Sequence, residues 1–250
     1  MIRVAGFLLL TLGLTQATSA ADPDALWHIV HDKCVPHQQQ DGNPAPCAEV
    51  DLGGGYVVLK DIVGKTQFLV MPTARVGGVE SPEILAPNAP NYWEAAWRAR
   101  HFVNERAGHP LPRDVIGLAI NSVSGRTQNQ LHIHVDCVRP AVSAALGEHA
   151  DAIGAKWTRF PVPLIGHGYM AMRLEQPELG GVNPFALVAD GVPGARDDMA
   201  HETLVVIGAR FAGKDGFVLL ADRASTILND RGSGEQLLDH ECAAAAAEAH

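Results

Sequence analysis

The sequence predicts an α+β protein in which antiparallel strands alternate with helices, and two observations carry this prediction. Short runs rich in β-branched and aromatic residues recur along the chain, separated by turn residues such as Gly64 and the triplet Lys214-Asp215-Gly216. Apolar residues recur at helical spacing between these runs, most clearly from Asn91 to Gly108. Because hydrophobic residues make up 47% of the 250 residues, the chain can bury a sizeable core in one domain or in two closely packed halves.

A helix followed by a β-hairpin is expected in the first third of the chain. Apolar residues at positions 25, 26, 29 and 30 indicate a short amphipathic helix over 24–33, and a polar loop follows it. The β-rich runs 55–59 and 66–71 are expected to pair, because Gly64 supplies a turn between them. Pro72 ends the second strand, since proline cannot donate to a sheet ladder.

The longest helix is expected over 91–108. Trp93 and Trp97 lie one turn apart there, and Gly108 with Pro110 forms a stop signal. Similar patterns predict the remaining elements, which are strands at 115–120 and 131–138, an alanine-rich helix at 141–156, a strand at 168–174, a helix at 184–199 and strands at 204–209 and 216–220.

The charge balance excludes one class of function. A formal net charge of -9 and a pI near 5.7 argue against a nucleic-acid binder, because such proteins usually need a basic patch that displaces counterions from phosphates. A small phosphate site remains compatible with this charge, since it needs a few local donors.

The N-terminus resembles a targeting segment, so residues 1–21 are expected to form a signal peptide or an N-terminal anchor. Arg3 precedes an apolar run of about eleven residues from Val4 to Leu14, which the polar Thr11 interrupts, and small residues at 18–21 offer a cleavage position near Ala21. The competing interpretation is an uncleaved anchor, although a helix needs roughly 20 apolar residues to span a bilayer. Either way, the protein is expected to be exported, to the periplasm or to the periplasmic face of the inner membrane.

Four cysteines in an exported chain suggest two disulfides. Cys34 and Cys47 bracket one loop and are natural partners, which leaves Cys137 to pair with Cys242. Spacing alone does not establish this connectivity, so the pairing is a prediction. A cysteine metal site is disfavoured because no Cys-x-x-Cys spacing occurs.

The segment 121–138, NSVSGRTQNQLHIHVDCV, carries the chemistry. Alternate side chains of a strand share a face, so Gln130, His132, His134 and Asp136 are expected on one face. Two histidines in this pattern can act as a nucleophile with its neighbour, as paired metal ligands, or as ordinary partly exposed residues. The preceding loop, 125–129, favours the first interpretation, because its backbone N–H groups and hydroxyl can bind phosphate oxygens. A neutral imidazole is a good nucleophile at phosphorus.

The order of these motifs resembles the histidine-triad (HIT) superfamily. The stretch FLVMPTARV at 68–76, the helix, VIGLAIN and QLHIHV follow one another as they do in those hydrolases, over roughly 56–138. The resemblance implies an antiparallel sheet with flanking helices.

More narrowly, the mature chain resembles the bacterial CDP-diacylglycerol pyrophosphatases. The similarity lies in CVPHQQQDGNPAPCAEV at 34–50, GYVVLKD at 55–61, FLVMPTARVGGVESP at 68–82, LAINSVSGRTQNQLHIHVDCVRP at 118–140 and HECA at 240–243. It implies cleavage of CDP-diacylglycerol to CMP and phosphatidate through a cytidylyl-histidine, with no cofactor or metal. It also implies contact with a membrane surface, because the substrate is a lipid.

The resemblance also assigns roles to individual residues. His132 occupies the nucleophilic position, and His134 would contact phosphate or orient the first imidazole. The other substrate-binding positions that it implies are Asn121, Arg126, Thr127 and Gln130. Independently of the resemblance, Lys60 is a candidate for phosphate contact because it lies at a strand end, where a solvated charge is the alternative. Gln130 departs from the superfamily pattern, which has histidine there, and an amide cannot shuttle a proton near neutral pH.

Two questions of organisation and function stay open. Residues 22–140 are expected to form the catalytic half, while 141–250 would form an α+β half packed on it, as a degenerate second unit of a pseudo-dimer; a homodimer is the alternative. The rival functions are a hydrolase of soluble nucleotide diphosphate derivatives and a non-catalytic nucleotide or metal binder.

Overall fold

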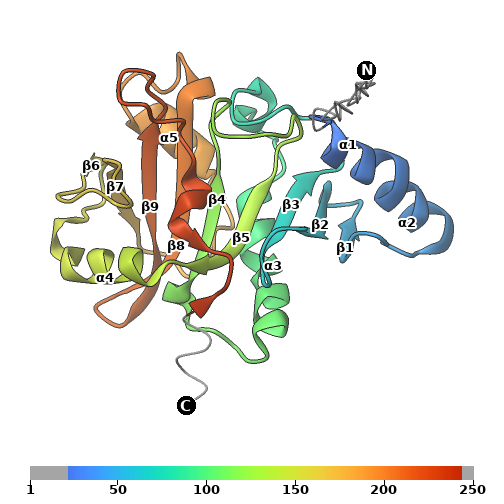
Figure 1. The fold of residues 1–250 in the computed structure, drawn as a ribbon, viewed down its shortest axis with the longest axis horizontal. Helices are drawn as coiled ribbons and strands as arrows, with labels where there is room; N and C mark the ends of the chain where they lie inside the picture. The colour runs from blue at the N-terminus through green and yellow to red at the C-terminus, as the bar shows by residue number, and fades with distance from the viewer. Residues whose placement is uncertain (1–21, 244–250) are drawn as a thin grey trace, which may run out of the picture.

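Ten strands form one antiparallel sheet in a computed structural model that describes residues 22–243 (Figure 1). The strand order is β1-β2-β3-β5-β4-β8-β9-β7-β6, and β10 pairs with β5. The strands are β1 Glu49–Asp51, β2 Tyr56–Lys60, β3 Phe68–Pro72, β4 Ile116–Ile120, β5 Ile133–Val138, β6 Thr158–Arg159, β7 Met170–Leu174, β8 Glu202–Phe211, β9 Lys214–Arg223 and β10 Leu238–Asp239. This architecture confirms the α+β prediction.

Helices cover both faces of this sheet. They are α1 Ala25–Ile29, α2 Val35–Asp41, α3 Tyr92–Ala107, α4 Pro140–Glu148 and α5 Pro184–Gly191. A π-helical turn, Val30–Cys34, joins α1 to α2, and short 3-10 helices lie at Pro82–Leu85, Arg113–Val115, Ala150–Ala152, Met199–His201 and Gly234–Leu237.

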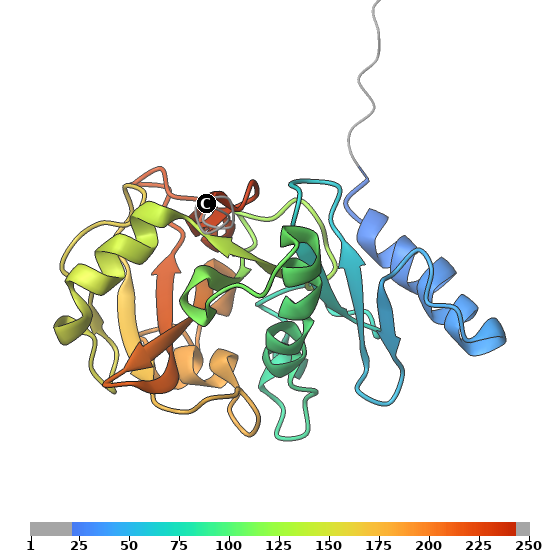
Figure 2. The same ribbon diagram turned by 90° about the horizontal axis from the view of Figure 1, so that it is seen from below.

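The two faces carry different layers (Figure 2). Helices α3 and α5 pack on one face, where Trp93, Trp97 and Phe185 are buried with Leu118 and Val206 of the central strands. On the other face, α4 covers the strands of the second half, and the α1–α2 segment covers β2 and β3. Between these two coverings, at β5, the second face is not covered by α1, α2 or α4, although the residues of β5 are buried.

Several elements differ from the sequence-based expectations. Helix α5 ends at Gly191 rather than near 199, because Val192 precedes Pro193 and a residue before proline is disfavoured in the helical region. The helical segment that begins at Ala25 continues to Asp41, beyond the predicted end at 33. Its π-helical turn at Val30–Cys34 leads into α2, and Pro36 lies in the first turn of α2, where proline is tolerated. Strands β1, β6 and β10 have two or three residues each, too few for a detectable alternation.

The structure contains both disulfides in the pairing that the sequence favours, Cys34–Cys47 and Cys137–Cys242. The first ties the helical turn before α2 to the loop before β1. The second ties β5 to the C-terminal segment, whose strand β10 pairs with the same strand. Residues from the end of the chain are thereby held beside the histidine motif.

Within residues 22–243, every helix is too short or too polar to traverse a lipid bilayer. The expected leader, 1–21, lies outside the described residues.

Candidate active site

The register of β5 places the two histidines on the uncovered part of the sheet. His134 pairs with Leu69 of β3 on one side and with Ala119 of β4 on the other. Residues paired across antiparallel strands share a face, so His134 lies on the face that α1, α2 and α4 flank. His132 comes two residues earlier and points the same way, as the period of a strand requires.

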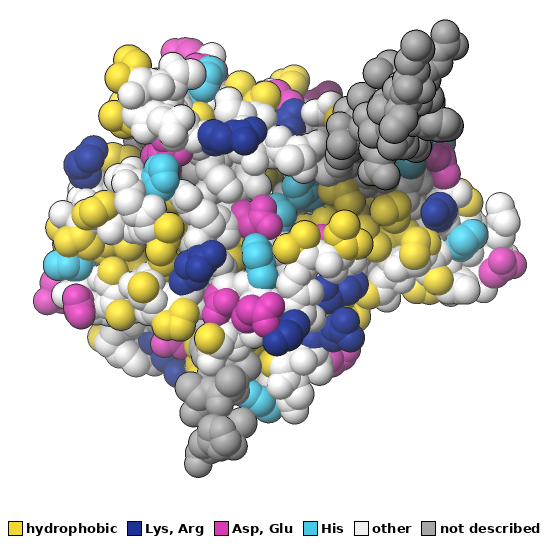
Figure 3. Space-filling view, viewed as in Figure 1, with side chains coloured by type: hydrophobic (Ala, Val, Ile, Leu, Met, Phe, Trp, Pro, Cys, Tyr) yellow, Lys and Arg dark blue, Asp and Glu magenta, His cyan; other side chains and the backbone are white. Residues whose placement is uncertain are grey.

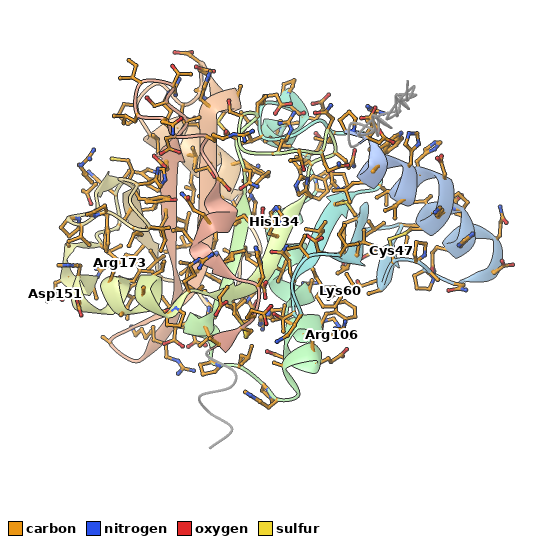
Figure 4. The ribbon with its side chains drawn as sticks, in the orientation of Figure 1. Cys47, Lys60, Arg106, His134, Asp151 and Arg173 are labelled. Atoms are coloured by element: carbon orange, nitrogen blue, oxygen red, sulfur yellow. A yellow bond between two sulfur atoms is a disulfide. The ribbon has the colours of Figure 1, made fainter. Side chains whose placement is uncertain are left out.

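A cavity of about 380 Å³ opens beside these histidines. It is lined by residues of α1, β2, the β2–β3 loop, the loop before β5 and the C-terminal segment, which are Ala25, Leu26, Ile29, Leu59, Lys60, Asp61, Ile62, Val63, Leu69, Asn121, Gly125, Thr127, Gln128, His132, His134 and Glu235. Figure 4 shows His134 near the centre of the molecule, and Lys60 lies at the end of β2, which β3 separates from β5. The cavity thus brings five of the candidate site residues together, namely His132, His134, Lys60, Asn121 and Thr127.

His132 has the protonation state that a nucleophile needs. Its Nδ1 lies 2.6 Å from the carbonyl oxygen of Gln130, which can only accept, so Nδ1 carries the proton and Nε2 keeps its lone pair. Burial, reinforced by the neighbouring His134, lowers the pKa of His132 to about 4. The ring is therefore neutral at neutral pH.

His134 is buried without a hydrogen bond. Its ring centroid lies 5.0 Å from that of His132, and neither ring nitrogen has a hydrogen-bond partner among residues 22–243. Its Nε2 lies 3.4 Å from a carboxylate oxygen of Glu235. Burial lowers the pKa of His134, although Glu235 opposes the shift. A buried polar group without a partner is costly, so a ligand in the cavity is the natural partner for this ring.

Glu235 and His240 join the site from the C-terminal segment. The imidazole of His240 bridges two carboxylates, with Nδ1 at 3.1 Å from Asp136 and Nε2 at 3.3 Å from Glu235. These two bonds raise the pKa of His240 to about 9. Burial would raise the pKa of Glu235, but the bond to His240, the charge of His134 and the bond from Asn121 together lower it to about 2. The group is therefore an ordered, charged support behind His134.

The sequence alone did not identify either residue as part of the site. Asn121 is 114 residues away from Glu235, yet its side-chain amide donates to the carboxylate at 3.2 Å and its oxygen accepts from the Glu235 backbone at 3.1 Å. The available signal was the HECA stretch at 240–243, which lies outside the histidine motif.

Two predicted binding residues do not line the cavity. Both guanidinium nitrogens of Arg126 bind the carboxylate of Glu80, at 2.5 and 2.7 Å, so the loop cation is already paired. Gln130 is fully buried, donates to the carbonyls of Pro72 and Ala74, and accepts from the backbone of Val76. Its amide therefore fixes the turn after β3.

The three-residue cluster with metal-ligand spacing lies elsewhere in the described part of the chain. Donor atoms of His167, Asp222 and Asp230 lie within 4.8 Å of one another, next to β9. His132 and His134 are not members of it.

Comparisons with known proteins identify the family of this chain. The profile of the family described as CDP-diacylglycerol pyrophosphatase matches residues 21–246. A protein of Yersinia pestis named CDP-diacylglycerol pyrophosphatase is 42% identical over 235 residues, which cover 94% of this chain and 90% of the relative. This chain belongs to the CDP-diacylglycerol pyrophosphatase family.

Proposed function

We propose that this protein is a hydrolase that cleaves CDP-diacylglycerol to CMP and phosphatidate, with Nε2 of His132 as the nucleophile. The observation that carries the proposal is the hydrogen bond from Nδ1 of His132 to the Gln130 carbonyl, which leaves an unprotonated Nε2 on a ring that lines the cavity. Family membership supplies the substrate.

The reaction has two displacements at one phosphorus. Nε2 attacks the phosphorus that bears cytidine, the P–O bond to the bridging oxygen breaks, and phosphatidate leaves. Water then attacks the same phosphorus, the P–N bond breaks, and CMP leaves with the electron pair of that bond returned to Nε2. The proton released by water goes to solvent or to the departing phosphate, so His132 ends in its initial neutral state.

The surrounding groups would stabilise the charge on the phosphate oxygens. Thr127 offers a hydroxyl, the Gly125 backbone lines the same wall, and Lys60 places a cation at the far side. His134 would donate from a nitrogen that now has no partner. The Glu235 carboxylate beside it favours the protonated imidazole once negative charge arrives.

The sheet supports a HIT-like, pseudo-dimeric organisation. Outward from the central β4–β8 pair, β5, β3 and β2 follow on one side, while β9, β7 and β6 follow on the other. In the second half the tight β8–β9 hairpin replaces the loop that precedes β5. We assign catalysis to 22–140 and a degenerate supporting role to 141–250, with the exception that 234–240 belongs to the site of the first half.

The location follows from the disulfides. Two disulfides fit an oxidising, exported compartment. We place the protein in the periplasm or at the periplasmic face of the inner membrane, where a lipid-linked substrate requires contact with the membrane surface.

The test is CMP release from CDP-diacylglycerol by the purified mature protein. His132→Ala should lower kcat by about three orders of magnitude or more, the scale seen when a nucleophile is lost, while substitution of the exposed His101 by Ala should leave it unchanged. Full turnover by the His132 variant would refute the assignment. Faster release of CMP from CDP-choline than from CDP-diacylglycerol would instead favour a hydrolase of soluble substrates.

A further inference from the structure

An apolar rim borders the mouth of the catalytic cavity. Ile62 of the β2–β3 loop lines the cavity and is 100% exposed, and Val63 beside it is 49% exposed. Leu26 and Ile29 of α1 line the opposite wall. Figure 3 shows hydrophobic side chains gathered on this face next to histidines, and Figure 2 shows the β2–β3 loop and the start of α1 projecting from the same side of the sheet.

The loop is built to hold its apolar side chains outward. Lys60 Nζ donates to the carbonyls of Asp61 and Gly64 at 2.6 and 3.0 Å, and the Val63 N–H donates to the Asp61 carboxylate at 3.0 Å. The backbone N–H of Lys65 donates to the His240 carbonyl at 2.9 Å. Because these hydrogen bonds hold the loop in one conformation, Ile62 is exposed in an ordered turn.

Helix α1 is attached to the loop that precedes the histidines. The N–H of Leu26 donates to the Gln128 side chain at 3.0 Å, and the Gln128 amide donates to the Asp22 carbonyl at 2.9 Å. The apolar wall and the phosphate-binding wall are therefore parts of one unit. Leu26, Ile29, Ile62 and Val63 line the same cavity as His132, so a ligand held at His132 lies next to this apolar surface.

The size of the cavity indicates which part of the substrate lies at this rim. A volume of about 380 Å³ lies near the lower end of the range for small-molecule sites, which suits a nucleotide diphosphate and leaves no room for two long acyl chains. In the sequence, the apolar run from Val4 to Leu14 closely precedes α1, so a leader that stayed attached would hold this rim near the bilayer.

We propose that Ile62, Val63, Leu26 and Ile29 form an acyl lip, which contacts long acyl chains beyond the length of a butanoyl group while the ends of those chains stay in the bilayer. The inference rests on the proposed function and adds the residues that recognise the lipid part of the substrate. Contact with hydrocarbon removes the apolar surface of Ile62 from water, which the isolated protein does not do.

The experiment compares two substrates and two double variants. The substrates are long-chain CDP-diacylglycerol in phosphatidylethanolamine vesicles and a water-soluble CDP-diacylglycerol with two butanoyl chains. The lip variant is Ile62→Ser with Val63→Ser. The matched control is Ile227→Ser with Leu228→Ser, because these side chains are 93% and 78% exposed and lie on a loop of the second half that does not line the catalytic cavity.

The lip variant should lose about tenfold or more in kcat/KM on the vesicle substrate, on the scale of two exposed aliphatic side chains, and less than twofold on the butanoyl substrate. The control variant should match the wild type on both. Equal losses on both substrates, an unchanged rate on vesicles, or an equal loss in the control would overturn the lip. If the double variant unfolds, the single variant Ile62→Ser is measured in its place, because a substitution at this fully exposed position should not disturb the fold. No CMP from either substrate with the wild type would refute the proposed function itself.

Discussion

The state of one imidazole decides when the site can react. In the proposed mechanism His132 acts through the lone pair on Nε2, and protonation of that atom would abolish its nucleophilicity. Its hydrogen bond to a backbone carbonyl fixes which nitrogen carries the proton, and burial holds the pKa of the ring near 4. Both effects come from the backbone and the neighbouring packing, so they act before any substrate binds.

Activity should therefore persist in mildly acidic solution. Because the pKa of His132 in the folded protein is lowered to about 4, the neutral form predominates above that pH, and kcat/KM should fall only as the pH drops through about 4. An exposed histidine would instead lose activity below about 6.5. A pH profile of kcat/KM with the butanoyl substrate measures the pH at which activity falls on the acidic side. A midpoint near 6.5 would show that the nucleophile titrates as a solvent-exposed ring.

The histidines could be predicted from the sequence because their chemistry is local. A strand places His132 and His134 on one face whatever the rest of the chain does. The ion pair of Arg126 could not be predicted in this way, since its partner, the carboxylate of Glu80, lies 46 residues away in the sequence. Glu235 and His240 could not be predicted for the same reason. Their contacts with His134 and Asp136 form only when the C-terminal segment packs beside β5 in the folded protein.

At the scale of elements, the C-terminal segment acts as a support for the site. Strand β10 pairs with β5, Cys242 is bonded to Cys137, and the His240 imidazole lies between Asp136 and Glu235. The major strands and the long helix were predictable from periodicity. The short β10 was not, because two residues carry no pattern and its position is fixed by a disulfide and a buried side chain.

Loss of the second disulfide should affect both stability and turnover. Replacing Cys137 and Cys242 by Ala frees a cross-link of 105 residues and should lower the free energy of unfolding by about 4 kcal/mol. It should also lower kcat, because Glu235 and His240 lose a tether. Replacing Cys34 and Cys47, whose separation is 13 residues, should cost about 3 kcal/mol and leave kcat nearly unchanged.

Urea unfolding and CMP release from the butanoyl substrate would measure the two effects. The support role would be contradicted if both double variants kept the wild-type kcat, or if the variant at Cys34 and Cys47 lost more of it.

At the scale of the whole molecule, the sheet joins the two halves of the sequence through backbone pairing. Gly117 to Ile120 of β4 pair with 204–207 of β8, and Leu118 and Val206 belong to one buried cluster. The alternation of strands and helices along the sequence led to the expectation of two packed halves. It could not reveal that the end of the second half returns to complete the site in the first.

The two halves should therefore lose solubility and activity when they are produced separately. A fragment of residues 22–140 would expose the edge of β4, leave Leu118 without its partner on β8, and lack Glu235 and His240. An unpaired apolar edge promotes aggregation, so the fragment should be poorly soluble and release no CMP. Co-expression with a fragment of residues 141–250 should restore soluble protein and part of the activity, because the β4–β8 ladder can form between separate chains. Circular dichroism and CMP release would measure both outcomes. A soluble 22–140 fragment that unfolds cooperatively and turns over substrate would show that the second half and its returning segment are dispensable.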